Sequence, residues 1–77
     1  MCVADYENGE WKEGQIVPYA DIPLSPATSA LHYGQAIFEG MKCDRDANST
    51  DVLIFGPQEN ARRFNQSAVR MGMPAEC

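Results

Sequence analysis

The sequence has few of the residues on which common catalytic and binding sites depend. Its 77 residues include one histidine and six basic residues, and neither a G-x-G-x-x-G nor a P-loop motif occurs. The largest basic cluster is Arg62-Arg63, and the formal net charge is −5. Because binding to a polyanion needs a basic surface, we expect no nucleic-acid partner.

The chain also lacks long apolar runs and closely spaced cysteines. No run approaches the roughly 20 apolar residues that a membrane helix needs, so we expect no membrane partner. The chain has three cysteines, which are Cys2, Cys43 and Cys77. An odd number of widely spaced cysteines favours neither a disulfide framework nor a metal site. The first residues show no charged region followed by an apolar one, so no secretory signal is indicated. We therefore expect a cytoplasmic protein with reduced thiols.

The sequence does contain the composition of a small globular domain. Hydrophobic residues make up 44% of the chain and charged residues 22%, which is ordinary for folded protein. A chain of this length buries only about 60% of the surface that its unfolded form exposes. We expect one small domain at most, with a thin core.

Turn-forming residues divide the start of the chain into short strands. Asn8-Gly9 predicts a hairpin between 3–6 and 11–12, because both of its residues tolerate the positive φ of a type I′ turn. Residues 15–19 form a third predicted strand, in which the proline indicates an edge or an end.

A proline-containing loop follows. Residues 20–30 hold two prolines and several small polar residues, which is typical of a loop. Ser25 as an N-cap and Pro26 at the first helical position favour a short helical turn at 26–31.

Two more strands are predicted in the second half of the chain. The first covers 35–43, where the alternation of a strand places Phe38 and Gly40 on one side and Glu39 on the other. A polar turn separates it from a compact β-branched and aromatic strand at 52–55. The two strands are expected to pair as a hairpin.

The last predicted element is a helix that begins at Pro57. An apolar stripe recurs along it at spacings of three and four residues, and its members are Ala61, Phe64, Ala68 and Met71. Glycine and proline at 72 and 74 end the helix. The predicted fold class is α+β, with antiparallel hairpins and one long helix.

Few side chains are candidates for chemistry. His32 has no partner at the spacing of a metal site or a catalytic pair, so a hydrogen-bonding or packing role is expected. Tyr33 and Phe38 suit either a core or the wall of an apolar pocket. Gly40 favours the pocket, because a glycine inside a strand is unfavourable unless something approaches its backbone closely. Arg63 lies mid-helix, where the residues alone favour a solvated side chain over a phosphate ligand.

Three blocks of sequence, in this order, resemble the branched-chain amino acid aminotransferases, which are fold-type IV enzymes dependent on pyridoxal 5′-phosphate (PLP). The first is Asn8-Gly9-Glu10-Trp11, and the second is Leu31-His32-Tyr33-Gly34-Gln35-Ala36-Ile37-Phe38-Glu39-Gly40-Met41-Lys42. The third is 60–68, followed by Met71-Gly72-Met73-Pro74. The resemblance covers nearly the whole chain. Gly56 and Cys43-Asp44 depart from the family pattern at positions outside the pocket.

The resemblance implies a role for four of these residues. Arg63 would hold the phosphate of PLP, and Phe38 and Gly40 would line the pocket for the substrate side chain. Tyr33 would reach the pocket of the neighbouring subunit in a homodimer. The enzymes of this family transfer the amino group of leucine, isoleucine or valine to 2-oxoglutarate.

The resemblance also implies that the chain is an N-terminal fragment, comprising part of the family's small domain as a single partial domain over 1–77. The chain has two lysines. Lys12 follows the predicted turn and Lys42 lies at the end of a predicted strand, so neither is expected to form the Schiff base with PLP. We therefore expect no catalytic residue in the chain and no turnover by it alone.

Two alternatives stay open. The chain could be a non-catalytic remnant that acts as an interaction module for an intact aminotransferase subunit. It could also belong to a fold-type IV enzyme with another reaction, such as D-amino acid transamination or lyase chemistry. The string at 32–41 looks most like the branched-chain group.

Overall fold

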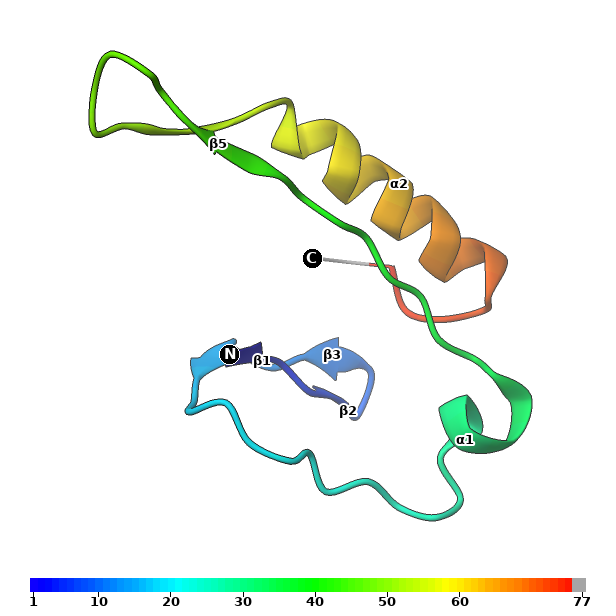
Figure 1. Ribbon diagram of the computed structural model, residues 1–77. Helices are drawn as coiled ribbons and strands as arrows, with labels where there is room; N and C mark the ends of the chain where they lie inside the picture. Colours follow the sequence, from blue (N-terminus) through cyan, green and yellow to red (C-terminus); the bar gives the residue numbers. More distant parts are fainter. Residues whose placement is uncertain (76–77) are drawn as a thin grey trace. The chain divides into compact units, whose positions relative to one another are not determined.

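A computed structural model describes residues 1–75, which divide into two compact units, residues 1–36 and residues 37–75. The described part of the first unit has two antiparallel pairs of strands and a short helix, and that of the second has one pair and a longer helix (Figure 1). This observed mixture of antiparallel hairpins and helix confirms the predicted α+β class. Cys2 and Cys43 are exposed free thiols, whereas Cys77 lies outside the described residues.

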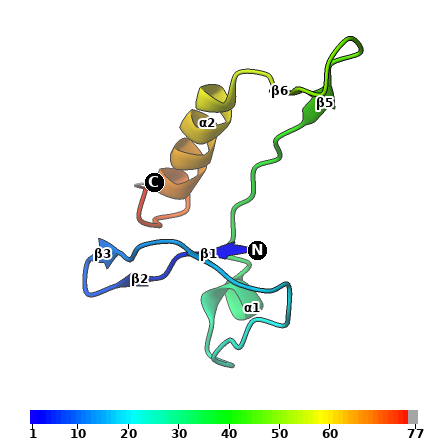
Figure 2. The same ribbon diagram turned by 90° about the vertical axis from the view of Figure 1, so that its left-hand side faces the viewer.

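The first unit begins with two nested antiparallel pairs. Strand β1 (Cys2–Val3) pairs with β4 (Gln15–Ile16), and between them β2 (Tyr6–Glu7) pairs with β3 (Glu10–Trp11). Figure 2 shows the tight turn that joins β2 to β3. Asn8 and Gly9 have φ values of 53° and 85° there, as a type I′ turn requires. The predicted hairpin is therefore confirmed.

Helix α1 (Ser29–Tyr33) begins three residues later than the sequence predicted. The Oγ atom of Ser25 accepts a hydrogen bond from the amide of Ala27 at 3.2 Å, and its carbonyl accepts one from the amide of Thr28 at 3.0 Å. Ser25 thus closes a separate turn, and Thr28 is the N-cap of the helix. The predicted cap was wrong because a serine side chain serves a turn as readily as a helix start.

In the second unit, the predicted strand at 35–43 is wrong over most of its length. Only Cys43 lies in a strand, β5 (Cys43–Arg45), which pairs with β6 (Val52–Ile54) as predicted. Within residues 1–75, no strand pairs with 35–42. An extended segment becomes a strand only when a second backbone offers it a ladder of hydrogen bonds, and this one is joined to a helix instead.

Helix α2 (Pro57–Arg70) follows the prediction at both ends. Gly56, with a φ of 58°, turns the chain into the helix, and Pro57 occupies the first turn. Along the predicted stripe, Ala68 is buried at 2% exposure and Phe64 is half-buried. Ala61 and Met71 are exposed, so their predicted places on the inner face were wrong.

The core is thin, as the chain length predicted. Among the described residues, Ala68 is the only one that is fully buried. Several large apolar side chains are mostly exposed, including Tyr33, Phe38 and Phe55. No helix within residues 1–75 is long and apolar enough to cross a membrane.

Candidate functional site

The centre of the candidate site is an ion pair between the extended segment and α2. The Nε atom of Arg63 donates to Oε2 of Glu39 at 3.0 Å, and its Nη2 atom donates to Oε1 at 2.6 Å. Figure 1 shows the extended segment beside α2. Two parallel hydrogen bonds between guanidinium and carboxylate fix the orientation of both groups.

Asn60 completes the cluster one helical turn before Arg63. Its side-chain amide donates to Oε1 of Glu39 at 3.0 Å and to the carbonyl oxygen of Gly40 at 2.8 Å. Residues three apart on a helix share a face, so Asn60 and Arg63 reach the same carboxylate. The amide of Gly40 also donates to Oε1 of Glu39, at 3.2 Å.

These contacts favour the charged forms of both partners. The hydrogen bond from Arg63 lowers the pKa of Glu39 below its usual value, with a further contribution from Asn60. The same hydrogen bond raises the pKa of Arg63. Glu39 therefore carries its negative charge, and Arg63 its positive charge, throughout the neutral range.

A second arginine pair lies next to the first. Arg62 donates through Nε to Oε2 of Glu59 at 2.9 Å, and both side chains are more than half exposed. An exposed pair of this kind on one helix contributes little to stability. The two adjacent arginines therefore differ in their partners. Arg62 is paired with a residue of α2, whereas Arg63 is paired with a residue outside it.

The donor groups of Arg63 fit a phosphate group such as that of PLP. A guanidinium has five N–H donors, and two of them go to Glu39. The remaining three include those on Nη1, and the Arg63 side chain is 53% exposed. Paired N–H groups of this geometry match two oxygens of a phosphate. Arg63 can thus supply one side of a phosphate site while it stays paired with Glu39.

Phe38 and Gly40 flank Glu39 and are both exposed, whereas Ile37 and Glu39 are half-buried. The predicted alternation of sides is therefore present, although the segment is no sheet strand. Phe38 is 90% exposed. A Cβ atom added to Gly40 would meet nothing within 4 Å, so the backbone at Gly40 is open to an approaching group.

The fourth predicted residue, Tyr33, belongs to the other unit. It is the last residue of α1 and is 85% exposed. The structure thus brings Phe38, Gly40 and Arg63 together in one unit through Glu39. The role of Tyr33 at a neighbouring subunit stays a prediction.

The histidine and the two lysines lie outside the cluster around Glu39. A ring nitrogen of His32 hydrogen-bonds the carbonyl oxygen of Pro26, which confirms the predicted hydrogen-bonding role. Lys12 pairs with Glu10, and Lys42 is exposed. Among residues 1–75, no group of histidine, cysteine or acidic side chains is arranged to hold a metal ion.

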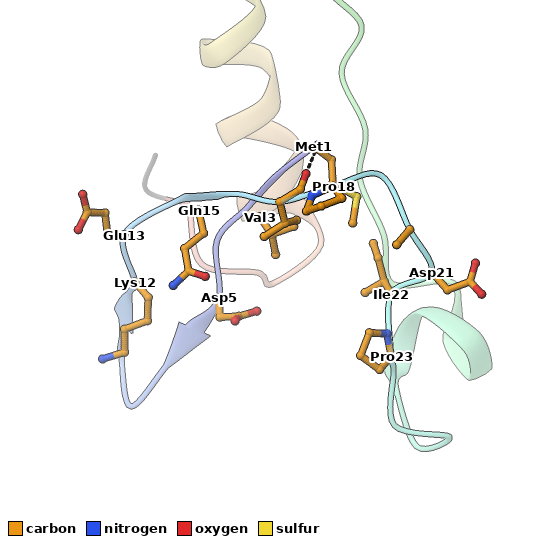
Figure 3. A pocket seen from close by; sticks show the side chains of 12 residues that line it. Met1, Val3, Asp5, Lys12, Glu13, Gln15, Pro18, Asp21, Ile22 and Pro23 are labelled. Atoms are coloured by element: carbon orange, nitrogen blue, oxygen red, sulfur yellow. Dashed lines mark hydrogen bonds between the residues drawn. The ribbon is translucent and has the colours of Figure 1, made fainter.

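The first unit contains a cleft that the sequence did not indicate. Its volume is about 400 Å³. The residues that line it are Met1, Val3, Asp5, Lys12, Glu13, Gln15, Val17, Pro18, Ala20, Asp21, Ile22 and Pro23. Figure 3 shows Ile22 and Pro23 facing Val3 across the cleft. None of the predicted site residues lines it. The cleft depends on the return of the loop after β4, which local patterns do not reveal.

Glu39 and Asn60 are the two site residues that sequence reasoning missed. A signal for Glu39 was present, because an acidic side chain within an apolar stretch needs a basic partner if it is buried. Asn60, three residues before Arg63, lies on the same helix face. Their common partner could not be identified, since the segment was expected to pair with a strand.

Comparison with known proteins gives a consistent result. The chain is 48% identical, over 96% of its length, to "Branched-chain-amino-acid transaminase 1" of Bacillus subtilis. It is 48% identical over 88% to a "Probable branched-chain-amino-acid aminotransferase" of Streptomyces coelicolor. It is 41% identical over 88% to "Branched-chain-amino-acid aminotransferase 3, chloroplastic" of Arabidopsis thaliana.

The matched part of each of these relatives is short. It spans 21%, 18% and 16% of their respective lengths. No family model matches the chain, and no solved structure matches it significantly. The similarity therefore concerns about a fifth of the length of such a protein.

Proposed function

We infer that this chain belongs to the branched-chain-amino-acid aminotransferase family over the segment it spans. On that premise, we propose that it supplies part of the PLP phosphate site and part of the substrate pocket. The observation that carries the proposal is the setting of Arg63, which is oriented by Glu39 and keeps three N–H donors for a ligand. When bound, PLP supplies the imine chemistry of transamination. The part of Arg63 is to hold its phosphate.

The substrate wall is formed in this proposal by Phe38 and Gly40. Their exposure on one side of the segment supports this role, because a leucine, isoleucine or valine side chain needs an apolar surface that it can approach closely. Tyr33 would contribute to the pocket of a neighbouring subunit in a homodimer. The second substrate would be 2-oxoglutarate.

The two units would then form parts of one N-terminal small domain of a fold-type IV enzyme in the cytoplasm. The exposed apolar side chains support this proposal, since exposed patches of this kind usually contact another surface. The relatives are about five times as long as this chain, and the Schiff-base lysine would come from the part of that length outside the chain. The 77 residues alone would be inactive.

The alternative of a separate interaction module gains no support from the comparisons, because the relatives are named as transaminases and aminotransferases. The same names favour branched-chain transamination over another fold-type IV reaction.

The test begins with the mature protein purified from its source and weighed by intact mass. We expect a product much heavier than the 8.5 kDa of these residues, with bound PLP and with transamination of leucine, isoleucine or valine by 2-oxoglutarate. The Arg63→Ala variant should lose PLP on dialysis, whereas Arg62→Ala, the matched control on the same helix, should keep it. Equal retention by the two variants would remove the phosphate role from Arg63.

A further inference from the structure

Glu39 is held more firmly than the arginine it contacts. Its carboxylate receives hydrogen bonds from two nitrogens of Arg63, from the side chain of Asn60 and from the amide of Gly40. Its side chain is 19% exposed, against 53% for that of Arg63. The carboxylate is therefore the anchored member of the pair.

The contact with Glu39 uses only one edge of the guanidinium. That edge is formed by Nε and Nη2, and the other edge is formed by Nη1 and Nη2. Because each edge presents parallel N–H groups, the second can bind two oxygens of a phosphate while the first stays on the carboxylate. A phosphate and Glu39 need not compete for the same donors.

We propose that Glu39 is a positioning residue, which holds the guanidinium of Arg63 by one edge so that the other edge is preorganised for the PLP phosphate. This inference rests on the proposed function. It gives Glu39 a role in cofactor binding, whereas its neighbours Phe38 and Gly40 are proposed to contact the substrate. It also makes Asn60 the residue that holds Glu39 in place from α2.

Two opposing effects decide whether the carboxylate helps the phosphate to bind. An unrestrained arginine side chain samples many rotamers, and binding must then restrict them. Against this, the negative charge of Glu39 repels the phosphate. The phosphate would bind at the opposite edge of the guanidinium, so the repulsion acts over a longer distance and is weakened by salt, whereas two hydrogen bonds restrict Arg63 at contact distance. We therefore expect the orienting effect to prevail.

The experiment compares PLP with pyridoxal, which has the same ring and aldehyde but no phosphate. Dissociation constants of both are measured for the mature protein and for its Glu39→Gln variant, in which the side chain keeps its size and loses its charge. We expect the constant for PLP to rise about tenfold, by analogy with the lower end of the loss that follows removal of a residue that orients a metal ligand. The constant for pyridoxal should stay unchanged. Glu59→Gln removes a carboxylate that acts on Arg63 through its charge but is hydrogen-bonded to Arg62. It is the matched control for loss of charge alone, and it should not weaken the binding of PLP or pyridoxal.

Two further variants isolate the route through Arg63. In an Arg63→Ala background, Glu39→Gln should no longer weaken PLP binding, because the side chain that Glu39 orients is gone and only its repulsion of the phosphate is removed. Asn60→Ala keeps both charges and removes one donor to Glu39, so it should weaken PLP by a smaller factor and leave pyridoxal unchanged. This variant also serves if Glu39→Gln does not fold.

The outcomes separate this inference from the proposed function. If Arg63→Ala binds PLP and pyridoxal in the same ratio as the unmodified protein, the phosphate role of Arg63 is wrong, and the inference is wrong with it. If Arg63→Ala selectively weakens PLP but Glu39→Gln leaves PLP binding unchanged or tighter, only the positioning role is wrong. Equal weakening of PLP and pyridoxal by Glu39→Gln would make Glu39 a purely structural residue.

Discussion

The side-chain amide of Asn60 in α2 donates a hydrogen bond of 2.8 Å to the carbonyl oxygen of Gly40, which lies 20 residues earlier in the chain. The same amide reaches Glu39 at 3.0 Å. Backbone groups that form no ladder must find other partners, and here a helix side chain provides one. The extended segment is thus attached to α2 by side chains rather than by strand pairing.

Replacement of Asn60 by alanine should destabilise the second unit. The substitution removes hydrogen bonds to Glu39 and Gly40, and the loss of such contacts costs about 1–2 kcal/mol of unfolding free energy. Urea denaturation of the mature protein measures the change. Gln66→Ala, at an exposed position of the same helix, is the control and should cost less than about 0.5 kcal/mol. Equal effects of the two variants would contradict the bridging role of Asn60.

The pair between Glu39 and Arg63 predicts a dependence of stability on pH. Because Arg63 lowers the pKa of Glu39 in the folded state below its ordinary value of 4.5, folding favours the ionised carboxylate. The resulting stability is complete above that ordinary value and is lost as the pH falls through the lower, folded-state pKa.

The measurement is the unfolding free energy from about pH 7 to about pH 3, for the unmodified protein and for Glu39→Gln. The difference between the two should be constant near neutrality and should shrink in acid, because glutamine does not titrate. A difference that stays the same down to about pH 3 would show that the charge of Glu39 adds nothing to stability.

The elements that the sequence predicted well are those with local causes. The turn at Asn8-Gly9 depends on two residues that accept positive φ, and α2 depends on its own periodicity and on Pro57. The start of α1 was misplaced because Ser25 had two local uses, and the structure takes the turn. Each of these outcomes involves hydrogen bonds between residues close in sequence.

The site could be predicted only in part, for a related reason. Phe38 and Gly40 were placed on one side correctly, because alternation is a local property of any extended chain. The partner of that chain was not predictable, since Glu39 and Arg63 are 24 residues apart. The resemblance to a family identified Arg63 as a candidate, whereas its contact with Glu39 came only from the structure.

Two glycines should respond differently to alanine. Gly9 has a φ of 85°, in which a side chain is strained, so Gly9→Ala should cost about 1–2 kcal/mol. Gly40 has no positive φ, and an added Cβ there meets nothing within 4 Å, so Gly40→Ala should leave the unfolding free energy nearly unchanged. Urea denaturation of the two variants of the mature protein tests the contrast. A large loss of stability in Gly40→Ala would mean that its backbone contacts another part of the protein.

Gly40→Ala and Phe38→Ala should instead change the use of substrate. If the substrate side chain lies against this side of the segment, a methyl group on Gly40 crowds it, and loss of the Phe38 ring removes apolar contact. Either change should lower kcat/KM for leucine about tenfold or more, since one methylene more or less in an apolar pocket is worth roughly 1–3 kcal/mol. The half-reaction with 2-oxoglutarate, whose side chain is a carboxylate, should be less affected by Phe38→Ala. Met41→Ala, at an exposed position one residue beyond Gly40, is the control. An equal loss for leucine and 2-oxoglutarate in Phe38→Ala would contradict a wall that recognises the apolar substrate, because the ring would then serve the protein as a whole.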